Sequence, residues 1–154
     1  MRNFRDYATR PPSRQASVAE SSITYTGVIL DKVSRDALLA AVRKHTPDGW
    51  RVIAHHMTIN MGPARNPTDL GKQVTLSVVG WALDERTLTV KVQGFASTNA
   101  HAHITVAVNS AAGAKPKDSN LHMKWTPIAA PLRLVGVVEE VPQDSMHKKT
   151  YNKS

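Results

Sequence analysis

The sequence predicts an α+β protein in which a helix covers one side of an antiparallel sheet, and two patterns support that class. Residues 73–83 and 87–95 alternate apolar and polar side chains, and residues 84–86 between them form the turn of a hairpin. Residues 35–45 instead space their apolar side chains as in a helix, with Ser34 placed to cap its start. Strand-like segments dominate, which is typical of a helix packed on one side of an antiparallel sheet.

The elements before the hairpin follow from local signals. Residues 23–30 are rich in β-branched side chains and predict the first strand. Pro47 and Gly49 end the helix, because proline cannot continue it and glycine tolerates a left-handed turn. Residues 50–60 then predict a strand, which the Gly-Pro pair at 62–63 interrupts.

The elements after the hairpin complete the sheet. Residues 102–106 predict a strand that joins the hairpin in a run of three neighbouring strands with up-and-down connections. Residues 110–120 form a loop, and 121–125 can form a short turn or helix. Residues 132–141, which begin just after a proline, predict the last strand.

Length and composition indicate one domain with its own core. The chain has 154 residues, of which 41% are hydrophobic. We expect a flexible arm at 1–22, the domain at 23–141 and a basic tail at 142–154. The lack of cysteine excludes disulfides, thiolate metal sites and a cysteine nucleophile. Since no apolar stretch resembles a membrane span or a signal peptide, we expect a cytoplasmic protein with no membrane contact. We also expect no cofactor and no obligate protein partner.

The charge balance favours an anionic ligand. Twenty Lys and Arg against twelve Asp and Glu give a net charge of +8, and residues 23–141 alone retain +4. A basic body suits a phosphate ester or a nucleic acid. The alternative, that these residues only solvate the surface, stays open on charge alone.

A duplicated motif points to the functional site. His56-Met57-Thr58-Ile59 and His103-Ile104-Thr105-Val106 each place a Thr two residues after a His, and the two histidines are 47 positions apart. In a strand, each His shares one face with its Thr, while the aliphatic residues share the other face. Packing of the core gives no reason for a Thr two residues after each His. We therefore expect the two His and the two Thr to form one catalytic site.

Paired imidazoles suit phosphodiester cleavage without a metal. A neutral imidazole removes a proton from the attacking hydroxyl or water, and a protonated imidazole donates to the leaving oxygen. The threonine hydroxyls can donate hydrogen bonds to the phosphate oxygens, where charge accumulates in the transition state. Which histidine is the acid and which is the base stays open.

The twin motif resembles the signature of the two-histidine phosphoesterase superfamily, which includes LigT-like RNA phosphodiesterases and eukaryotic cyclic phosphodiesterases. The resemblance covers residues 25–141. It implies a LigT-like fold in which antiparallel β-sheets form a central cleft with few flanking helices, and each of two similar lobes supplies one motif.

Flanking residues are similar to those of small phage anti-CBASS phosphodiesterases. The similar stretches are Tyr25-Thr26-Gly27-Val28, residues 55–62, Lys115-Pro116 with Asp118-Ser119-Asn120, and residues 134–141. That family degrades cyclic di- and trinucleotide signals of bacterial immunity without a metal, which implies a cyclic oligonucleotide substrate and, for a phage protein, a location in the host cytoplasm. It also implies that Tyr25 and a carboxylate of the last strand, Glu140, line the nucleotide pocket. Adjacent Glu139 and Glu140 face opposite ways, so the choice between them stays open.

Alternatives remain for the substrate and for the chemistry. An RNA-derived 2′,3′-cyclic phosphate or a 2′–5′-linked oligonucleotide could replace the cyclic substrate. A zinc or iron site is a rival, because His101 and His103 share one strand face and His55 or His56 could approach them. The lack of a nearby carboxylate and the paired threonines argue against a metal.

A non-catalytic nucleic-acid-binding module is the rival from another class. It rests on the basic body and on Trp50, Trp81 and Trp125 as stacking surfaces. Trp81 is the best candidate for substrate contact, because it lies on the more polar face of the hairpin. Lys115 could either reach a phosphate from its loop or remain solvated.

Overall fold

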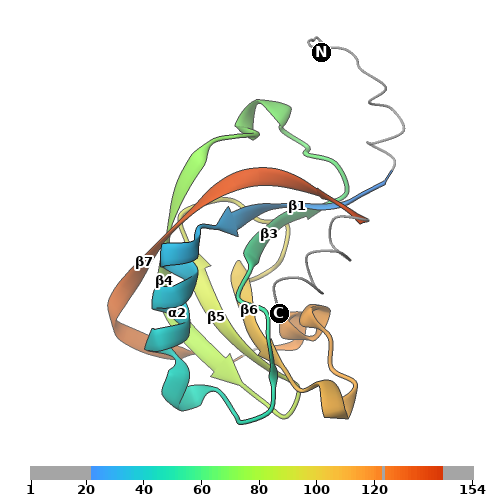
Figure 1. Cartoon of the computed structure of the whole chain (residues 1–154). Helices are drawn as coiled ribbons and strands as arrows, with labels where there is room; N and C mark the ends of the chain where they lie inside the picture. Colours follow the sequence, from blue (N-terminus) through green and yellow to red (C-terminus); the bar gives the residue numbers. More distant parts are fainter. Residues whose placement is uncertain (1–21, 123, 144–154) are drawn as a thin grey trace.

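The computed structural model describes residues 22–122 and 124–143, so nearly all of the predicted arm and tail lies outside the described residues. Seven antiparallel strands form one sheet in the order β2-β6-β3-β1-β7-β4-β5, and a further pairing of β6 with β5 closes six of them into a barrel (Figure 1). The elements are β1 (Ile23–Leu30), α2 (Lys32–Ala41), η1 (Arg43–His45), β2 (Arg51–Val52), β3 (His56–Met61), η2 (Pro67–Asp69), β4 (Gln73–Leu83), β5 (Thr87–Gln93), β6 (His103–Val108), η3 (Ser110–Ala112), η4 (Pro116–Leu121) and β7 (Thr126–Pro142).

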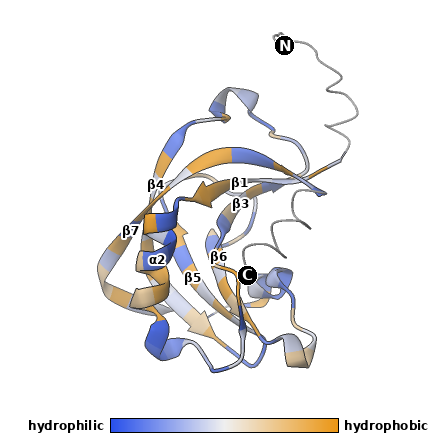
Figure 2. Cartoon of the chain, viewed as in Figure 1, coloured by the Kyte–Doolittle hydropathy of each residue, from blue (hydrophilic) through white to orange (hydrophobic). Residues whose placement is uncertain are grey.

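The barrel interior is apolar because alternate residues of the strands turn inward. Figure 2 shows the alternation as hydrophobic and hydrophilic bands along the strands. The fully buried side chains of this core include Val28, Leu38, Met57, Leu76, Leu88, Val90, Ile104, Val106 and Leu134. Burial of one such side chain stabilises the fold by roughly 1.5–3 kcal/mol. A shift of the strand register by one residue would turn the apolar side chains of that strand outward, and several of these contributions would be lost.

Helix α2 begins earlier than predicted, and Ser34 is not its cap. The Asp31 carboxylate accepts a hydrogen bond from the Ser34 N–H at 2.7 Å and caps the helix that begins at Lys32. The Ser34 hydroxyl instead accepts from the Val135 N–H at 2.7 Å, which ties α2 to β7. Leu38 points into the core as expected.

The predicted strand over residues 50–60 is interrupted. Ala54 has a positive φ of 44°, and this kink separates β2 from β3. The kink keeps the chain against β6, because the Ala54 N–H donates to the Thr105 carbonyl at 3.0 Å. The structure thus corrects one continuous strand to two short ones along the same neighbour.

The last strand is longer than predicted. It begins at Thr126 rather than at residue 132, and it includes Pro127 and Pro131. The β4–β7 register shifts between Val78 and Gly80, so Pro131 lies where the ladder is irregular and its missing N–H is not needed.

The predicted fold class is confirmed at the level of an α+β protein with antiparallel strands and few helices. The hairpin β4–β5 and its neighbour β6 pair in sequence order, as expected. Among the described residues, no helix combines the length and the apolar composition that a bilayer crossing requires.

Candidate functional site

The structure brings the two motifs together on the outer wall of the barrel. Strands β3 and β6 pair with Met57 opposite Ile104, and both of these side chains are fully buried in the core. The flanking motif residues therefore point outward. They are His56, Thr58, His103 and Thr105. His103 is close enough to His56 to contribute to the lowered pKa of His56, after burial and His55.

His56 is held between β1 and its own strand. Its ring stacks on Tyr25 with centroids 4.3 Å apart, and the Tyr25 hydroxyl lies 3.1 Å from its Nδ1. Gly27 allows this stack, because a Cβ there would lie 2.8 Å from the Met57 carbonyl oxygen and 3.3 Å from the Tyr25 ring. His55 Nδ1 also approaches His56 Nδ1, at 3.0 Å.

The contacts of His56 bear on its tautomer. Burial, followed by the nearby charge of Glu139, raises the pKa of Tyr25, so its hydroxyl stays protonated and can donate. If it donates to His56 Nδ1, the proton of the neutral ring lies on Nε2, which is 3.2 Å from Thr58 Oγ1. Burial, together with His55 and His103, lowers the pKa of His56 to about 3.

His103 has the opposite tautomer. Its Nδ1 lies 2.7 Å from the backbone carbonyl oxygen of His101, which can only accept. Nδ1 therefore carries the proton, and Nε2 of the neutral ring has a free lone pair. Burial lowers the pKa of His103, the bond to His101 partly opposes that effect, and His122 and His101 lower it further.

A hollow of about 270 Å³ adjoins His103, and we call it the His103 hollow. Its lining includes His101, Ser119, Asn120, His122 and Trp125. The Trp125 indole Nε1 is buried and has no hydrogen-bond partner in the part of the chain that the structure describes. Sequence reasoning preferred Trp81, whereas Trp125 is the tryptophan beside the motif histidine.

A chain of hydroxyls fixes the wall of this hollow. The Pro116 carbonyl accepts from Thr105 Oγ1 at 3.2 Å, so Thr105 in turn accepts from Ser119 Oγ at 2.8 Å. Ser119 then accepts from Thr89 Oγ1 at 2.6 Å. Thr105 therefore anchors η4 over β5 and β6, whereas the Thr58 hydroxyl lies 3.2 Å from His56 Nε2.

Sequence reasoning gave no role to Ser119 or His122. His122 is buried and lies 2.7 Å from Thr87 Oγ1, and its Nδ1 lies 3.8 Å from the Asp84 carboxylate. Ser119 belongs to the stretch that resembles the phage enzymes, so that resemblance offered a signal for it. Nothing near His122 in the sequence marks it as different from any other loop histidine.

Lys115 contributes its backbone rather than its ammonium to this wall. Its N–H donates to the Asp118 carboxylate at 2.9 Å, and Arg86 Nε donates to the same oxygen at 3.0 Å. The Lys115 bond is the main cause of the lowered pKa of Asp118, and Arg86 adds to it. The Lys115 side chain is exposed, so its predicted phosphate contact stays a prediction.

The structure does not bring Trp81 to the motifs. Trp81 stacks on His45 with centroids 3.8 Å apart and lines a separate hollow with Leu38 and Leu132. This position follows from its place at the end of β4, where it pairs with Thr126.

Of the two adjacent glutamates of β7, Glu139 rather than Glu140 acts on a residue of the motif site. Glu140 accepts from the Ala64 N–H at 2.8 Å and so holds the loop after β3. Glu139 acts on the pKa of Tyr25, the residue that stacks on His56. The alternation along β7 explains the difference, because adjacent residues face opposite ways.

The metal alternative finds no ligand cluster. Within residues 22–122 and 124–143, no three His, Asp or Glu side chains are grouped as a metal site requires. His103 Nδ1 is moreover engaged by a carbonyl, which leaves it one nitrogen for any ligand.

Comparison with known proteins adds no family assignment: no protein-family model matches the chain, and no curated protein has a significant match to it.

Proposed function

We propose that this protein is a metal-independent phosphodiesterase that uses His103 and His56 as base and acid, with cyclic oligonucleotides as its substrates. The observation that carries the proposal is the pair of outward imidazoles on adjacent strands, of which His103 presents a free Nε2. The proposal assigns the opposite tautomer to His56, with Nδ1 accepting from Tyr25 and the proton on Nε2 beside Thr58. The duplicated His-x-Thr motif and its resemblance to two-histidine phosphoesterases support the reaction class and a LigT-like fold. The flanking similarity to phage anti-CBASS enzymes supports the cyclic substrate.

A bound phosphodiester would activate both imidazoles. In the free protein both pKa values are lowered, so both rings are neutral near pH 7. An anion placed between them favours their protonated forms and raises both pKa values. The basic body adds long-range attraction for such an anion.

The reaction then proceeds in one displacement. His103 Nε2 removes the proton from water or from a ribose 2′-hydroxyl as its oxygen bonds to phosphorus. The bond from phosphorus to the leaving oxygen breaks, and protonated His56 donates its Nε2 proton to that oxygen. The Thr58 hydroxyl donates to a non-bridging oxygen, where negative charge grows. Exchange of protons with solvent restores both rings.

The test is turnover of a substrate panel in EDTA. We expect the protein to cleave at least one member of a panel of cyclic dinucleotides, cyclic trinucleotides, 2′,3′-cyclic-phosphate RNA and 2′–5′-linked oligoadenylate, with products separated by chromatography. Cleavage of only the 2′,3′-cyclic-phosphate RNA or the 2′–5′-linked oligoadenylate would contradict the proposed cyclic oligonucleotide substrate but support the proposed phosphodiesterase reaction. No turnover at a protein concentration near that of the substrate would contradict the proposal.

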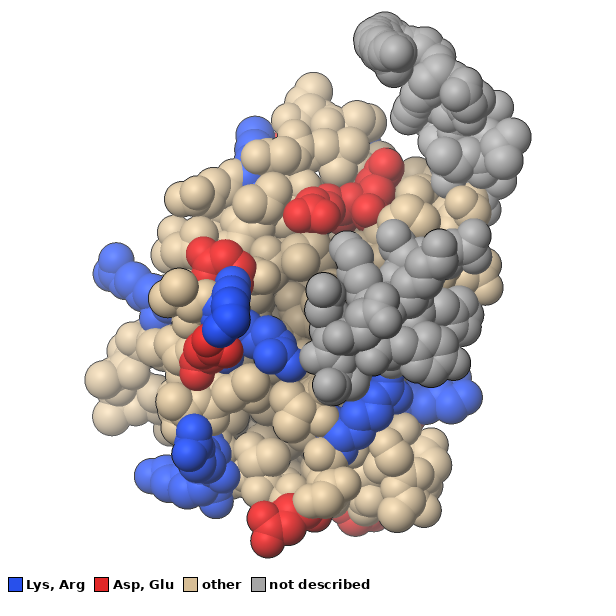
Figure 3. Space-filling view, in the orientation of Figure 1, with Lys and Arg blue, Asp and Glu red and all other residues tan. Residues whose placement is uncertain are grey.

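The same experiment separates an enzyme from a binding module. A His56→Ala, His103→Ala double variant should bind the substrate but not cleave it. On the face seen in Figure 3, Lys and Arg side chains are scattered and several lie beside acidic ones, whereas a nucleic-acid-binding surface has a basic stripe.

A further inference from the structure

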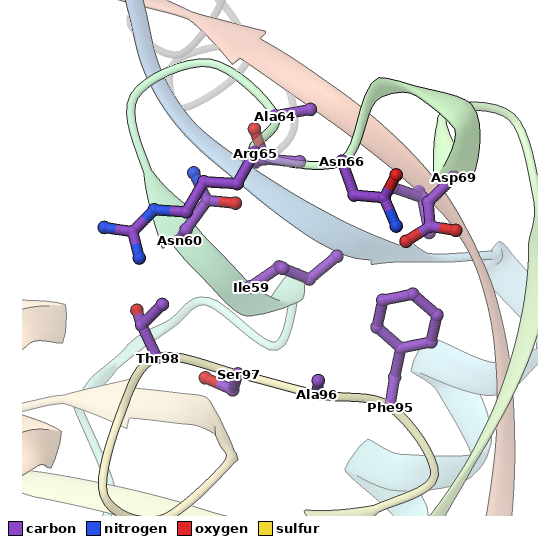
Figure 4. Close-up of a pocket in the computed structure, with 12 residues that line it drawn as sticks. Ile59, Asn60, Ala64, Arg65, Asn66, Asp69, Phe95, Ala96, Ser97 and Thr98 are labelled. Atoms are coloured by element: carbon purple, nitrogen blue, oxygen red, sulfur yellow. The ribbon is translucent and has the colours of Figure 1, made fainter.

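Another hollow, of about 310 Å³, opens between the loop after β3 and the segment after β5 (Figure 4). We call it the mouth hollow. The residues that matter for its chemistry are Ile59, Arg65, Asn66, Asp69, Phe95 and Thr98. Its volume lies at the lower end of the range for small-molecule sites, about 300–1,000 Å³.

The segment that carries Phe95 is fixed to the motif strand. Gly94 turns the chain off β5 with a φ of 127°, and a Cβ there would lie 2.5 Å from the Thr75 carbonyl oxygen. The Ser97 hydroxyl then donates to the Thr58 carbonyl at 2.7 Å, and the Thr98 N–H donates to the Ile59 carbonyl at 2.8 Å. The mouth hollow is therefore built on the same strand as His56 and Thr58.

One end of the mouth hollow has the groups that recognise a base. The Phe95 ring is half-buried and faces the side chains of Asn66 and Asp69 (Figure 4). The Asn66 Oδ1 accepts from Thr68 at 2.8 Å, which leaves its Nδ2 as a donor. The Asp69 carboxylate is mostly buried and held by Lys72 at 2.7 Å, with its other oxygen free to accept.

The other end leads toward the catalytic histidines. In Figure 4 the Arg65 guanidinium extends away from Phe95, toward the side of the hollow where Thr98 lies. Arg65 is exposed and has no ion-pair partner among the described residues. Thr98 lines both the mouth hollow and the His103 hollow, so the two hollows are neighbours that share this residue in their walls.

We propose that the mouth hollow binds an amino-bearing purine nucleotide, with the base on Phe95 and its phosphate directed past Arg65 and Thr98 toward His103. The proposal rests on the proposed function in that this nucleotide would be the unit beside the scissile phosphate. Phe95 supplies a stacking surface, and stacking favours the larger purine ring. Asp69 accepts from the amino group of adenine or guanine, while Asn66 donates to a neighbouring ring nitrogen or carbonyl oxygen.

Uracil lacks the groups that this end recognises. It has no amino group, and its two carbonyl oxygens would face the Asp69 carboxylate on either side of its single N–H. The carboxylate would repel these two oxygens, so discrimination against uracil follows from the same residue that favours purines.

Mononucleotides test the site without relying on turnover, because they contain no phosphodiester to cleave. We expect AMP and GMP to bind the wild-type protein at least tenfold more tightly than UMP by calorimetry, with the tighter of the two identifying the preferred purine. Phe95→Leu and Asp69→Asn should each weaken purine binding roughly tenfold, an effect of the size expected for one stacking contact or one charged hydrogen bond. Asp36→Asn is the matched control, because Asp36 also pairs with a lysine at 2.7 Å but lies on α2.

A kinetic arm separates this inference from the proposed function. In Phe95→Leu, kcat/KM for a purine cyclic dinucleotide should fall more than kcat/KM for bis(p-nitrophenyl) phosphate, which has no base. Asp36→Asn, which lies on α2, should leave both values unchanged. Purine binding without any turnover would contradict the proposed function but support the mouth hollow as a purine site. Equal affinity for UMP and for the purine nucleotides would contradict purine binding in the mouth hollow, whatever the enzyme cleaves. Purine affinity that neither variant changes would contradict it as well.

Discussion

His103 shows how a backbone contact can set the role of a side chain. The carbonyl of His101 fixes the proton on Nδ1, and burial keeps the ring neutral, so Nε2 is available as a base. The proposed reaction requires the opposite tautomer of His56, with the Tyr25 hydroxyl donating to its Nδ1. In that proposal, neighbouring groups prepare two chemically identical side chains for different steps.

The lowered pKa values predict how stability depends on pH. The folded protein resists protonation of His56, whose pKa falls from 6.5 to about 3, while the unfolded chain accepts that proton. The unfolding free energy should therefore hold its full value above pH 6.5 and decrease as the pH falls toward 3, by up to about 1.4 kcal/mol per pH unit for this group. Urea denaturation between pH 7 and pH 4.5 measures it. His56→Asn should flatten this dependence, and an unchanged slope in the variant would show that His56 titrates normally.

The Tyr25 hydroxyl can be removed without losing the ring stack. Tyr25→Phe keeps the contact with His56 but removes the donor to Nδ1, so the proton is free to move from Nε2 to Nδ1. We expect kcat to fall roughly tenfold, the scale of a mispositioned proton donor, with little change in the melting temperature. Nitrogen chemical shifts of His56 should show the mixed tautomers. A variant with wild-type kcat and an unchanged tautomer would rule out this role.

At the scale of elements, η4 acts as a clamp on the outer faces of β5 and β6. Its hydroxyl chain runs from Thr89 through Ser119 to Thr105, and Arg86 holds the same segment through Asp118. Polar residues on that barrel face are buried because η4 covers them. The clamp explains why Thr105, although it belongs to the motif, bonds to protein rather than facing the hollow.

Ser119 is the central link of that chain. Ser119→Ala leaves the buried Thr89 and Thr105 hydroxyls without one partner each, so we expect a loss of about 1–3 kcal/mol in unfolding free energy. Chemical denaturation measures the loss. Ser110→Ala is the control, since Ser110 is exposed at the start of η3. Equal stability of the two variants would mean that the clamp adds nothing to the fold.

At the scale of the whole molecule, the sequence predicts the fold class and the facing of the two motifs better than it predicts the closure of the sheet into a barrel. Period-2 alternation locates the hairpin and the facing of both His-x-Thr motifs, because that pattern is a local property of a strand. The pairing of β6 with β3 joins residues distant in sequence, such as Met57 and Ile104, and no local signal encodes it.

The misplaced site residues have the same origin. Strand facing predicts Trp81 and the resemblance implies Glu140, but their positions depend on where β4 meets the start of β7 and on how the loop after β3 folds back. Ser119, His122 and Trp125 reach the site only because the segment after β6 returns over the barrel wall. Such returns depend on tertiary packing.

The central claim is that His56 and His103 together cleave a phosphodiester without a metal. The most direct test is the single-turnover rate in EDTA on the best substrate of the panel, for the wild-type protein, His56→Ala, His103→Ala and a His45→Ala control that only removes the stack on Trp81. Each motif variant should lose at least about 100-fold, the scale of general acid–base catalysis, while the control keeps its rate. Retention of the wild-type rate by either motif variant, or an equal loss in the control, would contradict the claim.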